Sequence, residues 1–180
     1  MDAKRLKGMP VVSIEGGEQL GTVHDLLFSI DDRAIQAFSV RSGGLIGGTT
    51  NVVERGDVRS IGPDAVMVQS RAVLQGEDTE HRYRQYPSLG EISSLKVVSE
   101  EGSRIGSVAS VLIDEQTGAI TGLEIVRAGL TGPFRSNISV PIDAVISIGR
   151  DAVVIPERVA NPPAEGAQPE TAPGQEESQG

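Results

Sequence analysis

The chain contains an internal repeat, and this repeat constrains its fold more than any other feature of the sequence. Residues 12–40 match residues 97–125 without a gap, at a spacing of 85 residues, so that Gly21 aligns with Gly106. Self-similarity at a fixed spacing is the signature of a repeated structural unit. We therefore expect two tandem copies of one small domain, each with the same order of elements.

A second pair of matching segments shows where the two copies differ. Residues 58–68 match residues 145–155, but at a spacing of 87. The two extra residues of the second copy must then lie between Val126 and Val140. Because insertions are tolerated in surface loops, the sequence predicts a loop at this place in both copies.

Each copy consists of short apolar segments separated by turn residues. Gly is frequent, with 22 residues, and no long window shows good helical periodicity. Short strands between regular turns are typical of a small β-barrel or sandwich. We predict an all-β fold whose strands in the first copy span residues 11–14, 20–30, 35–40, 52–53, 58–61 and 65–68.

The third predicted strand has a break in its alternation of apolar residues. In the first copy the apolar residues are Ile35, Phe38 and Val40, and the second copy repeats the change of phase after Ile120. A change of phase that both copies share predicts a β-bulge or the start of a bend.

The turn and core pattern resembles the PRC-barrel family. The resemblance rests on Lys7–Ser13, Gly16–Phe28 and Asp57–Val66, and the second copy keeps Gly102, Ile105–Val108 and Ser147–Gly149. Position 110 is Ser where the first copy has Asp25, so the second copy matches less well. Members of the family include the cytoplasmic domain of the photosynthetic reaction-centre H subunit and the C-terminal domain of a ribosome maturation factor. The resemblance implies two tandem PRC-type β-barrels used for protein contacts, without shared catalytic residues.

The resemblance and the composition together suggest a division of the chain. We expect the first barrel over residues 6–70, a polar linker over 71–90, the second barrel over 91–156 and an acidic tail over 160–180. The tail contains no Lys, Arg or aromatic residue, and no apolar residue larger than Ala. It cannot bury enough surface to offset the entropy of ordering, which predicts disorder.

Charge and composition narrow the classes of partner. The net charge is −9, which argues against binding to nucleic acid or to an anionic membrane surface. The sequence has no Cys, which excludes disulfides, thiolate metal sites and thiol catalysis. Neither a signal-peptide pattern nor a stretch of about 20 apolar residues is present, so we expect a cytoplasmic protein without a membrane span.

No catalytic, metal or cofactor site is predicted. His24 and Asp25 are neighbours on a strand and point to opposite faces, so they do not form a catalytic pair. Asp31 and Asp32 lie in a turn, where Asp bonds to its own backbone more often than to a metal.

Two regions are candidate contacts with a partner. Matching loops carry Leu45 and Ile46 in the first copy and Leu130 and Phe134 in the second. Apolar residues at a loop tip can bind a partner, or they can fold back onto the barrel end.

The linker carries the second candidate region, Arg82, Tyr83 and Tyr86. These side chains can stack on bases, or the tyrosines can pack on a barrel.

The leading functional hypothesis is a non-enzymatic protein-binding adaptor or scaffold. Two similar domains offer two similar surfaces, which suits a bivalent interaction with a protein partner or a homo-oligomer. The alternative is an RNA- or ribosome-associated assembly factor. It rests on family analogy, which is a weak basis for function, and on the basic and aromatic residues of the linker.

Overall fold

A computed structural model describes the chain except for residues 44–47, 77–79, 129–136 and 161–180. The predicted tail beyond residue 160 therefore lies outside the described residues. The elements are η1 (Ala3–Leu6), β1 (Pro10–Ser13), β2 (Gln19–Ser29), β3 (Ala34–Ser42), β4 (Thr49–Glu54), η2 (Arg55–Asp57), β5 (Val58–Ile61), β6 (Val66–Val68), η3 (Arg71–Val73), α1 (Glu80–Tyr83), α2 (Leu89–Ile92), β7 (Lys96–Ser99), β8 (Arg104–Ile113), β9 (Ile120–Arg127), β10 (Asn137–Pro141), η6 (Ile142–Ala144), β11 (Ser147–Ile148), β12 (Ala152–Ile155) and α3 (Glu157–Ala160).

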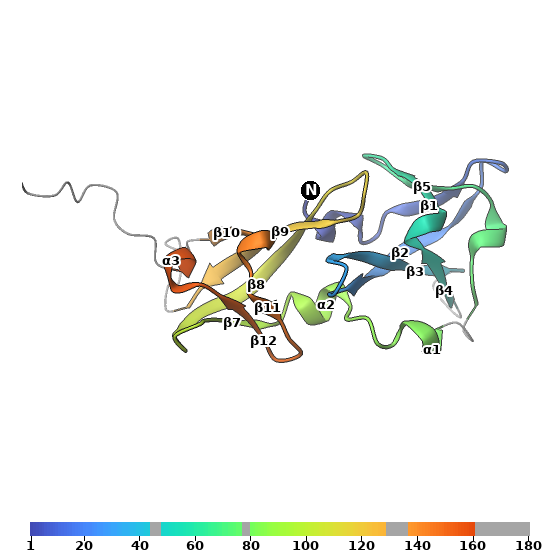
Figure 1. The fold of residues 1–180 in the computed structure, drawn as a ribbon. Coiled ribbons are helices and arrows are strands. Elements are labelled where there is room, and N and C mark those ends of the chain that lie inside the picture. Colours follow the sequence, from blue (N-terminus) through green and yellow to red (C-terminus); the bar gives the residue numbers. More distant parts are fainter. Residues whose placement is uncertain (44–47, 77–79, 129–136, 161–180) are drawn as a thin grey trace, which may run out of the picture.

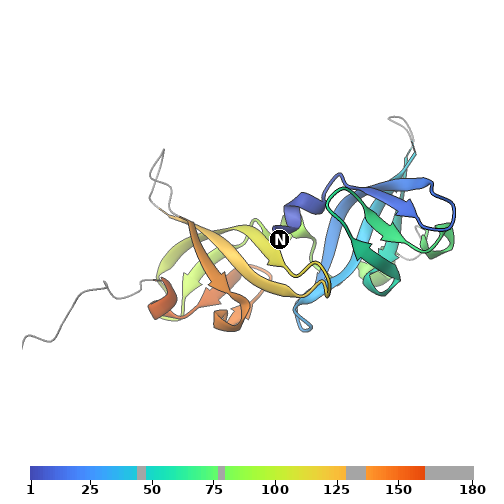
Figure 2. The same cartoon turned by 90° about the horizontal axis from the view of Figure 1, so that it is seen from above.

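The strands form two six-stranded sheets, which confirms the prediction of an all-β fold with two tandem domains. Domain 1 contains the sheet with the order β4-β3-β2-β1-β6-β5, and domain 2 contains β10-β9-β8-β7-β12-β11. The two sheets have the same connectivity, and Figures 1 and 2 show each of them strongly twisted. In each sheet one pair of strands is parallel, β1 with β6 and β7 with β12, whereas the other pairs are antiparallel.

The break in alternation corresponds to a bulge in both domains, as predicted. Leu27 pairs with Ala37 and Phe28 with Ile35, so that Gln36 is the extra residue on β3. The same irregularity lies between Leu112 and Ile113, where Thr121 is the extra residue on β9. A bulge lets two residues with an odd spacing face the same side of a sheet, which explains the change of phase.

The aligned pair Gly21 and Gly106 marks a close approach of two strands. A Cβ atom at Gly21 would lie 2.5 Å from the carbonyl oxygen of Arg41, and one at Gly106 would lie still closer to the carbonyl oxygen of Val126. No side chain fits at such distances, so each domain requires glycine at this position of its long strand.

The turns between the long strands of the two domains contact each other reciprocally. The Ile35 N–H donates to the Gly118 carbonyl at 2.9 Å, and the Ile120 N–H donates to the Arg33 carbonyl at 2.7 Å. At the repeat spacing of 85, Ile35 matches Ile120 and Arg33 matches Gly118, so the two bonds are equivalent. Arg33 and Gly118 both have positive φ angles, of 51° and 75°. The contact is therefore isologous, as in a twofold dimer, although both halves belong to one chain.

A short helix that precedes each sheet packs on the other domain. The helix η1 contacts β8, and α2 contacts β2. The Phe28 N–H donates to the Pro87 carbonyl at 3.0 Å, and the Ile113 N–H donates to the Met1 carbonyl at 2.8 Å. These contacts also exchange under the repeat. Buried apolar side chains of both domains form one continuous cluster, apart from a small second cluster around Tyr83. The domains are packed as a single unit.

The linker covers one edge of domain 1. Gln75 exchanges two backbone hydrogen bonds with Val52 of β4, at 2.8 and 2.9 Å. Tyr83 of α1 packs against Ala37 and Val52, and its hydroxyl donates to Glu54 at 2.5 Å. The outer edge of β4 is thus occupied by the chain itself.

Candidate functional site

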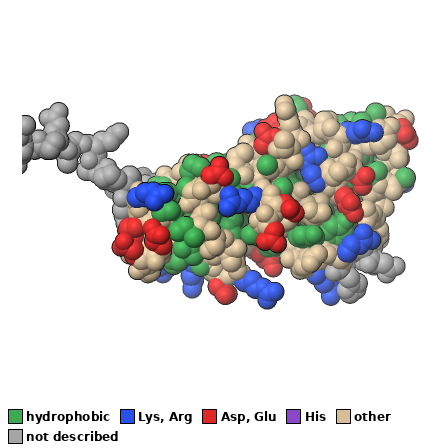
Figure 3. Space-filling view, viewed as in Figure 1, with side chains coloured by type: hydrophobic (Ala, Val, Ile, Leu, Met, Phe, Trp, Pro, Cys, Tyr) green, Lys and Arg blue, Asp and Glu red, His purple; other side chains and the backbone are tan. Residues whose placement is uncertain are grey.

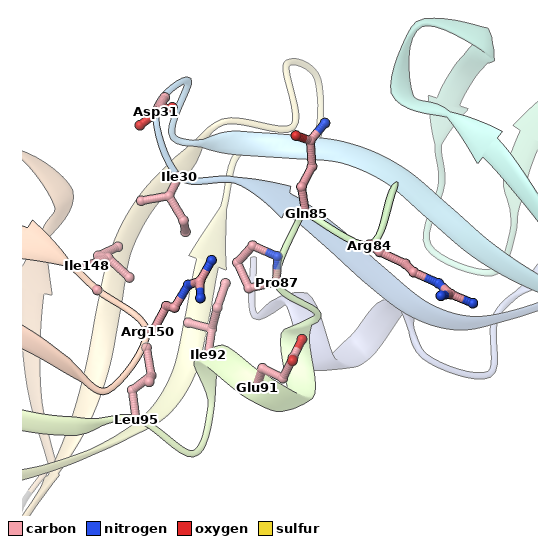
Figure 4. A pocket seen from close by; sticks show the side chains of 11 residues that line it. Ile30, Asp31, Arg84, Gln85, Pro87, Glu91, Ile92, Leu95, Ile148 and Arg150 are labelled. Carbon is pink, nitrogen blue, oxygen red and sulfur yellow. The ribbon is translucent and has the colours of Figure 1, made fainter. Parts of the chain in front are cut away.

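A half-open pocket of about 640 Å³ lies at the junction of the two domains (Figure 4). Its walls come from the turn after β2, from the linker and α2, and from the turn between β11 and β12. Five apolar side chains contribute to it, together with charged groups of both signs. The lining residues are Ile30, Asp31, Arg84, Gln85, Pro87, Glu91, Ile92, Leu95, Ile148, Gly149 and Arg150.

Local sequence fixes the linker side of this pocket. Ser88 and Glu91 form a capping box at the start of α2, in which the Glu91 carboxylate accepts the Ser88 N–H at 2.7 Å and the Ser88 hydroxyl accepts the Glu91 N–H at 3.2 Å. Such reciprocal bonds satisfy two helix-terminal N–H groups and set the direction of the helix. The bond from Phe28 to the Pro87 carbonyl ties the preceding residue to β2. These contacts hold Ile92 at the base of the pocket.

Arg150 is an exposed residue that provides a positive charge at the pocket. It lies in the turn between β11 and β12, which the bond from the Gly149 N–H to the Ala152 carbonyl closes at 2.9 Å. Figure 4 shows its guanidinium group pointing toward Ile92 and Pro87, whereas the side chain of Arg84 runs away from them. In the described part of the chain, Arg150 has neither an ion pair nor a side-chain hydrogen bond, so its five N–H donors remain available to a ligand.

The pseudo-twofold counterpart of this pocket has a different chemistry. Glu115 matches the apolar Ile30 at the repeat spacing of 85, and Pro63 matches Arg150 at the spacing of 87. The combination of an apolar wall with an inward cation therefore occurs on one side of the molecule. The sequence analysis missed this pocket, although the departure of Ile30 from the repeat was a visible signal.

The candidate contacts in the two matching loops lie in segments that the structure does not describe. Leu45, Ile46, Leu130 and Phe134 all lie outside the described residues. Their contact with a partner stays a prediction.

The structure separates the candidate residues of the linker. Tyr83 is 4% exposed, and its ring lies 6.1 Å from that of the half-buried Tyr86. Arg82 is exposed and pairs with Glu54 at 3.9 Å. Burial, followed by the hydrogen bond to Glu54, raises the pKa of Tyr83 to about 12, and the same bond is the main cause that lowers the pKa of Glu54. Tyr83 therefore holds the linker on domain 1.

The remaining polar residues of interest serve local structure. Asp25 pairs with Lys7 at 3.2 Å, whereas the neighbouring His24 is exposed. Asp32 accepts the Ser29 hydroxyl at 2.6 Å. The residues that the structure describes contain no group of three His, Asp or Glu side chains suited to a metal ion.

Asp114, in the matching turn of the second domain, bonds to nearby backbone. Its carboxylate accepts the backbone N–H groups of Thr117 at 2.7 Å and Gln116 at 3.0 Å. The backbone hydrogen bond from Thr117 is the largest cause that lowers the pKa of Asp114.

The surface and the helices give two further observations. Figure 3 shows Lys and Arg side chains interspersed with Asp and Glu on the face seen in Figure 1, with apolar side chains between them. Within the ranges that the structure describes, none of the helices has the length and apolar character to cross a membrane.

Comparison with known proteins identifies the repeated unit. The PRC-barrel domain family matches the chain twice, over residues 1–75 and over residues 88–161. The two matches cover most of the chain and correspond to the two sheets, each with the short helix that precedes it. A search of curated proteins finds no match.

Proposed function

This chain belongs to the PRC-barrel family, and we propose that it is a non-enzymatic protein-binding adaptor. Its partner inserts an apolar side chain, flanked by a carboxylate, into the pocket between the two domains. The observation that supports the proposal most directly is Arg150, which points into a pocket with apolar walls and is not paired with an acid of the described chain.

The shape and the chemistry of the pocket suit a peptide segment. A half-open site with a volume of about 640 Å³ accepts a side chain and part of its backbone. Ile30, Pro87 and Ile148 are half-buried and provide apolar contact, which contributes roughly 25 cal/mol for each Å² that a ligand buries. The Arg150 guanidinium can bind a carboxylate through two parallel hydrogen bonds, which adds directional specificity.

The rigid junction supports a role in binding. The walls of the pocket come from both domains, and reciprocal backbone hydrogen bonds hold the domains together. A preformed site loses less conformational entropy when a ligand binds. Two acids of domain 1 serve local structure, since Asp25 pairs with Lys7 and Glu54 accepts the Tyr83 hydroxyl.

A peptide library displayed on phage tests this proposal. The full chain is immobilised, and the bound peptides are sequenced after several rounds of selection. We expect enrichment of peptides in which a large apolar residue lies next to Asp or Glu. With Arg150→Glu the preferred charge should change to Lys or Arg, and with Ile148→Asp the enrichment should be lost.

Arg84→Glu is the matched control, because Arg84 lines the same pocket but points away from its centre. This variant should select the same peptides as the parent chain. A preference that stays unchanged in Arg150→Glu would place the binding site elsewhere. A preference that follows Arg84 would show that Arg150 does not select the charge of the peptide. Either result contradicts the proposal.

A further inference from the structure

The outer edge of β10 is the feature of domain 2 that departs most from its counterpart in domain 1. Ser139 of β10 pairs with Glu124 of β9, and Val52 of β4 pairs with Ser39 of β3. Ser139 matches Val52 at the spacing of 87, and Glu124 matches Ser39 at the spacing of 85. The backbone N–H and C=O of Val52 point away from β3 and bond to Gln75. By the same register, those of Ser139 point to the free edge of β10, and the described chain gives them no partner.

The segment that corresponds to the linker cannot reproduce this bond pattern. At the repeat spacing of 87, the counterpart of Gln75 is Pro162, which Pro163 follows. Proline has no backbone N–H, so Pro162 cannot donate to Ser139 as Gln75 donates to Val52. The remainder of the chain is rich in Pro, Gly and Glu, which are depleted in strands. The chain's own tail is therefore poorly suited to this edge.

Among the free strand edges of the described sheets, β10 is the best suited to pairing. The edge strand β5 has a bulge between Val58 and Ser60 and carries Arg59, and β11 has only two residues. Bulges, charges and short length are the devices by which proteins protect an edge. The five residues of β10 are in regular register and carry no charge, and Pro141 at its end is the one protective residue.

We propose that β10 pairs antiparallel with β10 of a second copy of this chain, across a twofold axis at Ser139. The sequence of the strand is self-complementary in this arrangement. The two Ser139 residues exchange both backbone hydrogen bonds, and Ile138 lies opposite Val140 of the second copy. The Asn137 N–H faces the carbonyl of Pro141 of the second copy. The dimer therefore lacks only two bonds, those that an N–H on each Pro141 would have donated. Like charges do not meet, and the two sheets join into one.

This dimer does not depend on the pocket, which lies at the junction of the domains and not along β10. Either proposal can therefore fail without the other. Sedimentation velocity of the full chain over a series of concentrations tests the dimer. We expect a shift from monomer to dimer as concentration rises, and Ser139→Lys should abolish the shift because two like charges would face each other on the axis.

Two further variants separate loss of pairing from loss of folding. Ser139→Thr keeps the N–H and a β-favouring side chain and should still dimerise. Ser60→Lys places the same charge on the edge strand β5, where Ser60 is also exposed, and should leave the dimer intact. Melting curves establish that each variant is folded. A chain that stays monomeric at every concentration, or a dimer that tolerates Ser139→Lys, overturns the proposal.

Discussion

The two domains of this chain have the same strand order and contact each other through equivalent residues, yet only one of them is covered by the linker. The bonds from Ile35 and Ile120 exchange under the repeat, as do those from Phe28 and Ile113. The linker breaks this equivalence, because Gln75 occupies the edge of β4. Two equivalent sets of bonds thus hold the junction. The single linker creates a pocket on one side, and among the described residues the edge of β10 has no partner.

The largest effect is expected from the reciprocal helices at the junction. Leu6 of η1 and Ile92 of α2 match at a spacing of 86 and are 0% and 1% exposed. Leu6→Ala and Ile92→Ala should each lower the free energy of unfolding by about 2–5 kcal/mol, by similar amounts. Calorimetry should show one transition in each variant, because the two domains share a core.

Ile14→Ala is the control for this pair, since Ile14 is 50% exposed and should change stability by less than about 0.5 kcal/mol. Two separate unfolding transitions would show that the domains unfold independently. That result would contradict a core shared by the two domains.

The second largest loss of stability is expected from substitution of the matching glycines in the long strands. Gly21→Ala and Gly106→Ala place a Cβ atom against a neighbouring carbonyl, which costs about 1–3 kcal/mol or more, with the larger loss at Gly106 where the approach is closer. Gly56→Ala, where a Cβ would have no atom within 4 Å, is the control. Urea denaturation checks the order, and equal stability of Gly56→Ala and Gly106→Ala would refute the close approach.

The contact of Tyr83 with domain 1 predicts that the stability of the protein decreases at alkaline pH. Tyr83 has a pKa of about 12 against the ordinary value of 10.0, so the folded state holds its proton more tightly than the unfolded state. The resulting stability is fully present below pH 10 and is lost as the pH rises toward 12, by on the order of 2 kcal/mol. Tyr83→Phe should lack this loss in stability curves.

A direct titration is available because the chain has two tyrosines. In Tyr86→Phe the phenolate absorbance reports Tyr83 alone, and its midpoint should lie at about 12. A midpoint at the ordinary value of 10.0 would mean that the linker does not hold Tyr83 on domain 1 in solution.

The smallest changes in stability are expected at Asp25 and Ser110, which are matching positions, and the two changes have opposite signs. Asp25 pairs with Lys7, so Asp25→Ala should destabilise the protein by less than about 1 kcal/mol. Ser110 is 3% exposed, and its hydroxyl has no hydrogen-bond partner in the described structure. Ser110→Ala should therefore leave stability unchanged or raise it by up to about 1 kcal/mol. Urea denaturation measures both, and a marked loss in Ser110→Ala would reveal an interaction of that hydroxyl.

Repetition explains how much of the fold the sequence predicts. The bulges at Gln36 and Thr121 were predictable because both copies carry the same change of phase. The parallel pairing of β1 with β6 was not predicted, since it joins distant segments that no turn connects. The reciprocal contact of Ile35 with Gly118 is made by backbone atoms, which leave no trace in side-chain patterns.

The candidate site was harder to predict than the fold. Ile30 and Arg150 meet only because the two domains pack in one way, and neither residue belongs to a motif. Tyr83 was recognisable as a residue of interest, but the sequence left open whether its ring stacks on a partner or packs on the first domain. The acceptor Glu54 lies far from it along the chain, at the end of β4.

Hydrogen exchange at two pairs of matching amides tests most directly whether the linker makes the halves different. We predict that Ile35 and Ile120 exchange equally slowly, because each donates across the junction. The Val52 amide should be protected at every protein concentration, whereas the Ser139 amide should exchange fast in dilute solution and slowly in concentrated solution. Protection of Ser139 in dilute solution would contradict this account, because it would show that the chain covers both edges itself.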